Sequence, residues 1–240
     1  MKKALNYTLI IYFKIYNKVF RKSRIFFNSF RILENNFPQS KEFKFIQVGA
    51  NDGVSFDNLY DFVIKRDSKG IVIEPLKEFY QQLELNYSRF KHIIKINKAV
   101  HPTRKEVYMY KVAENTLLKY PLWAQGCASF DPEHLIKLNI DSKDISKLTV
   151  ISDNLMNIYI QNYHFTSVDY FQVDTEGFDF EVLKMINFNL FKPSIIKYEH
   201  TNLNKMDLAN SITLLRNNGY FIFYETEDII ACLLEKIKLY

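Results

Sequence analysis

Short apolar runs alternate along the chain with longer segments in which apolar residues recur every three or four positions. A short run bounded by Gly, Pro or Asn is typical of a buried strand, and the longer spacing is typical of a helix. Strands are predicted at 43–48, 70–73, 92–96, 168–173 and 194–198. Helices are predicted over 56–65 with Ser55 as its cap, over 75–86, from 153 onward, and over 178–187 and 205–217. This alternation predicts an α/β fold, in which a mostly parallel sheet is covered by helices on both faces and closed by strands at 220–224 and 229–234.

The alternation is interrupted between residues 101 and 152. Apolar and polar residues alternate over 106–111, which predicts an antiparallel strand, and a further strand is predicted at 148–151. Between them lies the irregular stretch P-L-W-A-Q-G-C-A-S-F-D-P, residues 121–132. Long irregular segments often form lids or substrate walls, and Trp123 could stack on a sugar or simply fill the core.

Basic charge is concentrated at the amino end. Of the 32 Lys and Arg residues eight lie within residues 1–37, and Glu34 is the one acid there out of 27. This leaves 24 basic and 26 acidic side chains for the remaining 203 residues, which are therefore close to neutral. A nucleic-acid enzyme usually carries its basic groove on the catalytic domain, so we expect no nucleic-acid partner. A break near Pro38 divides the chain into a basic helical arm, 1–40, and one domain, 41–240.

The arm begins M-K-K-A-L-N-Y-T-L-I-I-Y-F-K-I-Y-N-K-V-F. Its longest apolar run, 9–13, is far shorter than the roughly 20 residues of a membrane span, and no small-residue cleavage site follows it. An amphipathic helix is predicted, packed on the body or on a second subunit of a homo-oligomer, with peripheral contact to an anionic membrane as the alternative. The two distant cysteines, Cys127 and Cys232, indicate a reducing compartment. We therefore expect a cytoplasmic protein, with the inner membrane face as the alternative location.

Polar residues follow several of the predicted strands. Ligands of parallel sheets bind beyond the carboxyl ends of the strands, so these residues should lie together. They are Gly49 to Gly53, Glu74, Asn97 to Ala99, Asp174 to Gly177, and Glu199 with His200.

The turn from Gly49 to Gly53 suits a cofactor. Its glycines would let the backbone approach a ligand, and the next helix would offer free N–H donors. Glu74 lies 21 residues after Gly53, where an acid can accept both hydroxyls of a ribose. The dinucleotide pattern G-x-G-x-x-G is absent and Asp52 suits a pyrophosphate poorly, which favours S-adenosylmethionine over NAD. The predicted cofactor residues are Gly49, Asn51, Asp52, Gly53, Glu74, Asn97, Ala99 and Asp174.

Four blocks stand in order over residues 43–200: F-I-Q-V-G-A-N-D-G, I-V-I-E-P, V-D-Y-F-Q-V-D-T-E-G-F-D-F-E-V-L and I-I-K-Y-E. Together they are similar to the FkbM family of S-adenosylmethionine-dependent methyltransferases. The resemblance implies a class I methyltransferase (Rossmann-like) fold with a seven-stranded sheet, and methyl transfer to a hydroxyl of a sugar or small natural product. It carries the family's cofactor positions onto Gly49, Gly53 and Glu74. Met185 and His200 depart from the usual family pattern and leave the acceptor open.

The candidate catalytic residues are Asp174, Glu176, Glu199 and His200. Methyl transfer needs an aligned acceptor, and a base helps as the hydroxyl loses its proton. Neighbouring carboxylates raise one another's pKa, which would suit such a base to neutral pH. We expect Asp174 nearest the methyl group, while Glu176 could equally cap a helix and His200 is more often structural. His134 is a weaker candidate still, and the carboxylates could hold a divalent metal, although none is expected.

The sequence thus predicts an S-adenosylmethionine-dependent O-methyltransferase for a hydroxyl of a saccharide, in a surface glycan or its precursor. One alternative is a methyltransferase for a lipid-linked or small secondary metabolite. Another is a non-catalytic S-adenosylmethionine-binding scaffold protein, which would bind the cofactor without turnover.

Overall fold

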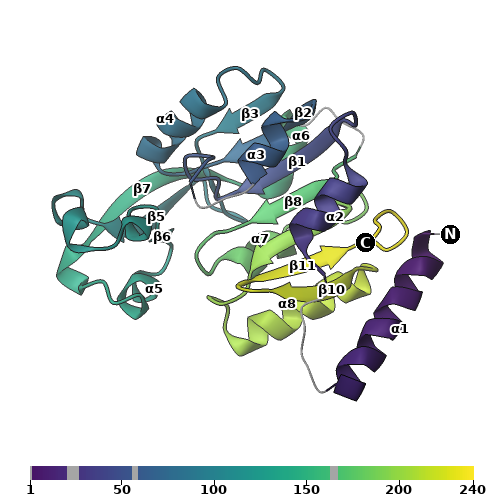
Figure 1. The fold of residues 1–240 in the computed structure, drawn as a ribbon. Helices are drawn as coiled ribbons and strands as arrows, with labels where there is room; N and C mark the ends of the chain where they lie inside the picture. The colour runs from purple at the N-terminus through teal and green to yellow at the C-terminus, as the bar shows by residue number, and fades with distance from the viewer. Residues whose placement is uncertain (1, 21–26, 56–58, 163–166) are drawn as a thin grey trace.

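The larger of two sheets has seven strands, in the order β10-β11-β9-β8-β1-β2-β3 (Figure 1). The computed structural model describes residues 2–20, 27–55, 59–162 and 167–240. The strands are β1 (Phe43–Val48), β2 (Ser68–Ile73), β3 (Ile93–Ile96), β8 (Tyr170–Val173), β9 (Ile195–Glu199), β10 (Phe221–Glu225) and β11 (Asp228–Cys232). Only β11 runs antiparallel to its neighbours, β9 and β10. The predicted α/β class with a mostly parallel sheet is confirmed.

Helices cover both faces of this sheet, because alternate strand residues are apolar on both sides. Along β1, Phe43 and Phe45 pack into one buried cluster and Ile46 and Val48 into the other. The Phe43 side receives α2 (Ser29–Asn36), α3 (Leu59–Ile64) and α4 (Lys77–Asn86). The opposite side receives α6 (Leu155–Asn162), α7 (Asp179–Lys184) and α8 (Lys205–Asn217).

The order of the strands reverses at β1, which pairs with β2 on one side and β8 on the other. From β1 the chain winds outward through β2 and β3, and it returns to β8 before winding outward to β9. The connections leave the carboxyl ends of β1 and β8 in opposite directions. A crevice at such a point is where open α/β sheets bind ligands.

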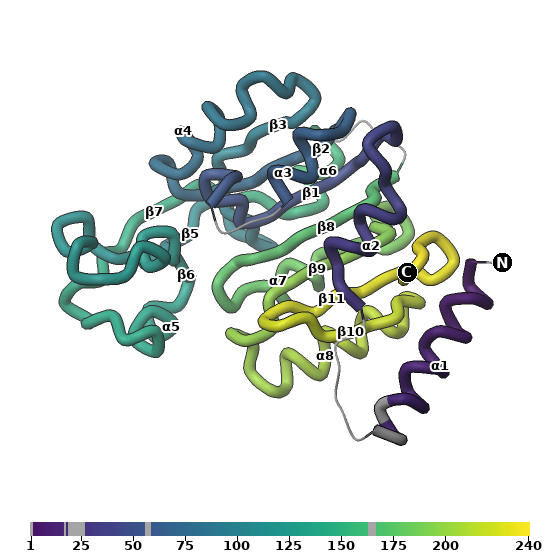
Figure 2. The backbone as a smooth tube through the Cα atoms, viewed as in Figure 1, coloured from purple at the N-terminus to yellow at the C-terminus, as the bar shows by residue number. Residues whose placement is uncertain are grey.

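Residues between β3 and α6 form an extension that projects from the sheet (Figure 2). Its four-stranded sheet has the order β4-β7-β5-β6. The elements are β4 (Ala99–Val100), β5 (Glu106–Val112), η1 (Glu114–Lys119), η2 (Leu122–Gln125), β6 (Ala128–Ser129), α5 (Pro132–Lys137), η3 (Ser142–Asp144) and β7 (Ile145–Asp153). The predicted antiparallel strand at 106–111 is confirmed, the one at 148–151 is longer than predicted, and α5 was not predicted.

Most predicted boundaries differ from the structure by only a few residues. The predictions at 43–48 and 205–217 match β1 and α8. The helix predicted over 178–187 is shorter, since α7 ends at Lys184. Part of the helix predicted over 56–65 lies outside the described residues, and the rest is α3.

The arm begins with α1 (Lys2–Phe20), which lies beside the carboxyl-terminal segment of the chain (Figure 1). A helix is predicted there, and α1 confirms it. None of the helices described is both long and apolar enough to cross a membrane.

Candidate active site

One face of the large sheet changes from apolar to polar along its strands. Side chains two residues apart on a strand, and those in register on neighbouring strands, share a face. The first row is buried and largely apolar: Phe45, Tyr170, Ile195 and Cys232. The next row is polar in its first three members: Gln47, Gln172, Lys197 and Ile230. The last, at the carboxyl ends of the parallel strands, is acidic: Asp174, Glu199 and Asp228.

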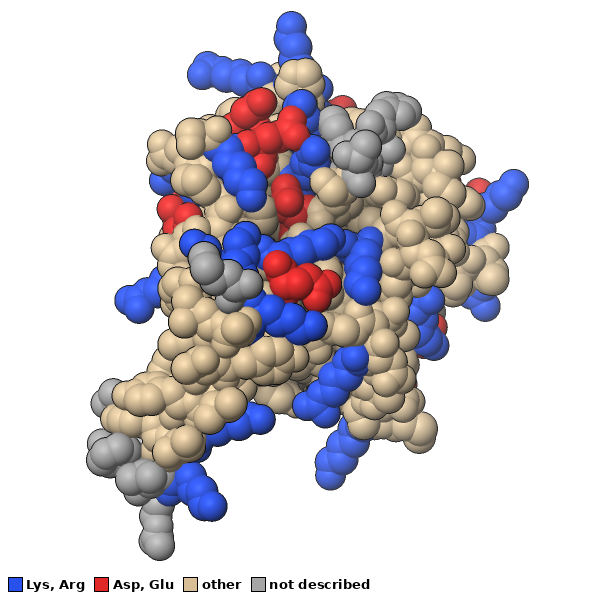
Figure 3. All heavy atoms as spheres, turned by 90° about the vertical axis from the view of Figure 1, so that its right-hand side faces the viewer, with Lys and Arg blue, Asp and Glu red and all other residues tan. Residues whose placement is uncertain are grey.

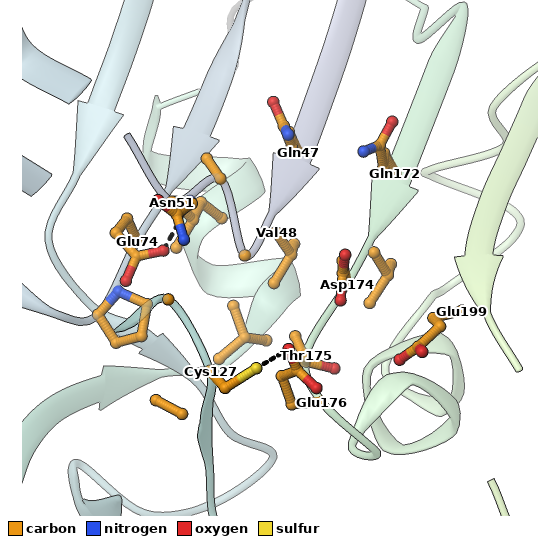
Figure 4. Close-up of a pocket in the computed structure, with 18 of the residues that line it drawn as sticks. Gln47, Val48, Asn51, Glu74, Cys127, Gln172, Asp174, Thr175, Glu176 and Glu199 are labelled. Carbon is orange, nitrogen blue, oxygen red and sulfur yellow. Dashed lines mark hydrogen bonds between the residues drawn. The ribbon is translucent and has the colours of Figure 1, made fainter. Parts of the chain in front are cut away.

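A cavity of about 780 Å³ lies where this face turns polar. Its wall on the sheet side includes Gln47, Gln172 and Asp174, whose side chains are drawn in Figure 4. The wall on the extension side includes Met109, Trp123, Cys127, Phe130 and Leu138. The extension therefore forms one wall of the cavity, as expected for the irregular stretch around Trp123.

Glu74, at the end of β2, is a buried carboxylate in the wall of this cavity (Figure 4). Its Oε2 accepts a hydrogen bond from the Asn51 backbone N–H at 2.8 Å, and its Oε1 accepts one from that of Leu76 at 2.9 Å. Burial raises the pKa of Glu74 to about 7, against the two hydrogen bonds, which lower it. The carboxylate is thus fixed in position, and its remaining lone pairs can accept hydrogen bonds from hydroxyl groups.

The two glycines of the turn after β1 face protein atoms. Gly49 has φ +78°, and a Cβ there would lie 1.7 Å from the carbonyl oxygen of Asp174. Gly53 has φ +79°, and a Cβ there would meet Leu83 and Tyr87 at 2.6 and 2.7 Å. Close packing of the protein itself therefore explains both glycines, whereas their positions in the sequence suggested the approach of a ligand.

Only part of the predicted turn lies along the cavity. Gly49 and Asn51 line it, whereas Asp52 and Gly53 do not. The Asp52 carboxylate instead accepts backbone N–H bonds from Val54 and Ser55 at 2.9 and 2.7 Å. Asp52 therefore stabilises the turn itself.

The two predicted cofactor residues that follow β3, Asn97 and Ala99, are also divided. Ala99 lines the cavity, and Asn97 does not. The amide of Asn97 donates to the backbone oxygens of Glu74 and Pro75 at 2.9 and 3.1 Å. Asn97 thus holds the loop that carries Glu74.

Three predicted catalytic carboxylates, Asp174, Glu176 and Glu199, come together on the side of the pocket away from Glu74 (Figure 4). The Asn202 amide lies between two of them, donating to Glu199 Oε2 at 2.7 Å and to Glu176 Oε2 at 3.4 Å. Desolvation raises the pKa of Asp174 to about 8, helped by the negative charges of Glu176 and Glu199. The side chain of Asp174 is exposed to the cavity. Burial likewise raises the pKa of Glu199.

Glu176 also contacts residues of the extension. Its Oε2 accepts a hydrogen bond from His134 Nε2 at 2.8 Å, which places the ring proton on that nitrogen. The Cys127 thiol donates to its Oε1 at 3.3 Å, and Ser129 Oγ donates to its backbone oxygen at 2.9 Å. Burial first, and then the Glu176 charge, raise the pKa of Cys127, so the thiol stays protonated and weakly nucleophilic.

The fourth catalytic candidate, His200, lies outside the cavity lining. Its ring packs edge-on against Tyr224 with the centroids 5.2 Å apart, and its backbone N–H donates to the Glu227 carbonyl at 2.9 Å. These contacts give it a structural role.

One site residue was missed in the sequence, and another was named only as a weak candidate. The contact of His134 with Glu176 could not be predicted, because nothing local connects α5 to the turn after β8. Asn202 could have been found, since it lies only three residues beyond Glu199 at the end of a strand. Within the described residues, no group of three or more His, Cys, Asp and Glu side chains is arranged to hold a metal ion.

Comparisons with known proteins identify the chain's relatives. The model of the family described as Methyltransferase FkbM domain matches residues 47–222. The curated proteins contain no match to this chain.

Solved structures with similar architecture are distant in sequence. The METTL16 methyltransferase domain is 12% identical with a TM-score of 0.47, covering 86% of this chain and 66% of that one. The chain therefore spans just under two thirds of that relative's length. Precorrin-6y C5,15-methyltransferase from Geobacter metallireducens is 9% identical with a TM-score of 0.41, covering 84% and 85% of the two chains.

The strand order and the family match together confirm the expected class I methyltransferase fold. The matched segment begins within β1 and ends within β10, so it includes all of β2, β3, β8 and β9. Because this segment makes up well over half of the sequence, the chain belongs to the FkbM methyltransferase family.

Proposed function

We propose that this methyltransferase uses S-adenosylmethionine to methylate a hydroxyl group of a saccharide. Family membership supports methyl transfer. The observation that carries the proposal is the division of the cavity, with Glu74 on one side and Asp174, Glu176 and Glu199 on the other (Figure 4).

The Glu74 side of the cavity suits the nucleoside part of the cofactor. A buried carboxylate held by two backbone N–H groups is a rigid acceptor for the two hydroxyls of a ribose. Ala99, which also lines the cavity, carries only a methyl group. Asp174 could accept from the ammonium of the methionine part. When bound, this cofactor supplies an electrophilic methyl group.

The opposite side suits a neutral acceptor with several hydroxyls. The carboxylates lining the cavity are Glu74, Asp174, Glu176, Glu199, Glu227 and Asp228. The two lysines there are paired with acids, Lys98 with Asp153 at 2.8 Å and Lys197 with Asp228 at 3.0 Å. Such a wall accepts hydrogen bonds from hydroxyl groups and repels phosphate groups. Trp123 adds a partly exposed ring on which the apolar face of a sugar could stack.

A carboxylate can receive the proton that the acceptor hydroxyl loses as its oxygen is methylated. Such a base works best when its pKa is near the working pH. Asp174, with its raised pKa, is the first candidate, and Glu199 is the second. Asn202 and His134 hold the neighbouring carboxylates in place.

The proposal is tested by calorimetric titration with S-adenosylmethionine and its demethylated product, followed by an acceptor screen. Micromolar binding and methylation of neutral sugars in preference to sugar phosphates are expected. Absence of cofactor binding to folded protein would overturn the assignment of the cofactor. Binding without turnover on any acceptor, together with unchanged function of Asp174→Asn in cells, would favour the scaffold alternative.

A further inference from the structure

The helix α1 is apolar on two opposite sides, and only one of them is used within the chain. Asn6 and Ile10 are buried against the body, and Phe13 packs on Phe27 with ring centroids 5.3 Å apart. At 3.6 residues per turn, these positions form the inner face.

Asn6 fixes the inner face to the carboxyl-terminal segment through buried hydrogen bonds. The Asn6 amide donates to the backbone oxygens of Leu234 and Ile237 at 3.0 and 2.6 Å. Its oxygen accepts the backbone N–H of Leu239 at 3.1 Å. These three hydrogen bonds are buried, so the rotation of the helix about its axis is fixed.

The outer face is defined by four exposed apolar side chains on the side roughly opposite Asn6 and Ile10. They are Leu5, Ile11, Tyr12 and Ile15, with exposed fractions of 45%, 56%, 57% and 57%. Side chains of this size normally gain by leaving water, yet no described part of the chain covers them.

The charge around this face has one sign. The helix carries four lysines and no acid. Lys14 and Lys18 lie along one edge of the outer face, whereas Lys2 and Lys3 contact Lys236 and Glu235 of the carboxyl-terminal segment. On the side of the molecule that carries α1, Lys and Arg side chains prevail over Asp and Glu (Figure 3). The face therefore complements an anionic surface.

A second copy of the chain is a poorer partner for the outer face. Symmetric pairing of two such helices would bring lysines against lysines, and like charges across an interface are unfavourable. Stable protein interfaces also use about 20–30 residues from each side, whereas the outer face offers four large apolar ones. A membrane requires only a narrow apolar stripe flanked by basic residues.

We propose that α1 binds the surface of an anionic lipid bilayer through Leu5, Ile11, Tyr12 and Ile15, with Lys14 and Lys18 contacting the lipid headgroups. The helix lies in the plane of the membrane, and Asn6 holds the methyltransferase domain against its other side. This inference does not depend on the cofactor or the acceptor.

The test is sedimentation of the full chain with vesicles. One set contains equal parts of phosphatidylcholine and phosphatidylglycerol, and the other contains phosphatidylcholine alone. We expect at least about tenfold stronger binding to the anionic set. The double variant Ile11→Ser/Ile15→Ser should reduce that binding by about tenfold or more, because both side chains are exposed and their loss leaves the inner face intact.

A matched control removes equally exposed apolar side chains elsewhere. Leu85 on α4 and Ile160 on α6 are exposed at 66% and 62%, and Leu85→Ser/Ile160→Ser should bind vesicles like the wild type. Equal binding by the outer-face variant, or no binding to anionic vesicles, would overturn the proposal. So would a dimer in light scattering that Ile11→Ser/Ile15→Ser converts to a monomer, because the second copy would then be the partner.

Discussion

The imidazole of His134 and the carboxylate of Glu176 are joined by a hydrogen bond of 2.8 Å from Nε2 to Oε2, although 41 residues separate them. Glu176 has φ +52°, a conformation that costs a non-glycine residue about 1–3 kcal/mol. Contacts from His134, Cys127 and Asn202 hold its carboxylate there. The extension thereby fixes a carboxylate that stands at the end of the large sheet.

Substitution of His134 should affect turnover more than cofactor binding. His134→Ala removes the shortest hydrogen bond to the Glu176 carboxylate, so we expect kcat to fall by roughly tenfold. The affinity for S-adenosylmethionine should change little, because the partner of His134 is Glu176, on the side of the cavity away from Glu74. Steady-state kinetics and calorimetry measure the two effects. His92→Ala, at an exposed position before β3, is the control, and equal losses of kcat and of affinity in His134→Ala would contradict a positioning role.

Glu74 should determine cofactor affinity. Glu74→Ala removes an acceptor for two ribose hydroxyls, and hydrogen bonds to a charged group contribute about 1.5–3 kcal/mol each. We expect Kd to rise by roughly 100-fold in calorimetric titration. Glu78→Ala is the matched control, since Glu78 pairs with Lys111 and does not line the cavity. Similar Kd values for the two variants would show that Glu74 does not bind the cofactor.

Ionisation of Asp174 should lower the free energy of unfolding as the pH rises. Its pKa is raised to about 8 in the folded protein, against about 4 in an unfolded chain, so the folded state retains a proton that the unfolded state has lost. The contribution to stability is complete below the unfolded pKa and is lost as the pH rises through the folded pKa. Asp174→Asn should therefore raise Tm relative to the wild type, by more at about pH 8 than at about pH 5. Thermal unfolding of both proteins across this pH range measures the difference in Tm. If that difference shrinks as the pH rises, the pKa of Asp174 is not raised in the folded protein.

The same carboxylate should govern the pH dependence of turnover. If Asp174 receives the proton of the acceptor, kcat/KM should rise with pH until that carboxylate is ionised in the free enzyme, at about pH 8. Asp174→Asn should abolish this rise along with most of the activity. An unchanged profile in a weakly active Asp174→Asn would assign the base to another group, with Glu199 the next to test.

The Gly49 position should tolerate no side chain. Gly49→Ala combines a positive φ with a Cβ 1.7 Å from a backbone oxygen, so we expect at least about 3 kcal/mol of destabilisation. Gly219→Ala separates the two causes, because Gly219 has φ +88° with no atom within 4 Å of the added Cβ. It should cost only about 1 kcal/mol in denaturant unfolding. Equal costs would mean that β8 moves away from Gly49 easily.

The main sheet could be predicted because each strand carries its own signal. The apolar run of β1 and the Asn204 cap of α8, whose side chain accepts from the backbone N–H groups of Met206 and Asp207, are local features. The grouping of Glu74, Asp174 and Glu199 at one edge of the sheet could be predicted because the carboxyl ends of parallel strands lie at the same edge. Such inferences need only the parallel order of the strands.

The remaining features depend on contacts between distant segments. Gly49 and Asp174 touch across 125 positions, and His134 reaches Glu176 from a helix with no predictive pattern. Asp52 was predicted to bind the cofactor because it is an acid in the turn from Gly49 to Gly53, yet its carboxylate accepts hydrogen bonds from the backbone N–H groups of Val54 and Ser55. Sequence alone does not reveal which polar group is satisfied locally and which one faces a cavity.

The chain leaves the body for the extension and returns to it at neighbouring points. Ala99 pairs with Ser152, and Val100 pairs with Asp153, in parallel register. Because the two ends of the extension are paired with each other, the extension can lengthen, shorten or change its sequence without a change in the strand order of the large sheet. Evolution, or a protein engineer, could therefore replace the whole extension, and with it one wall of the cavity, while Glu74 and the carboxylates at the strand ends keep their positions.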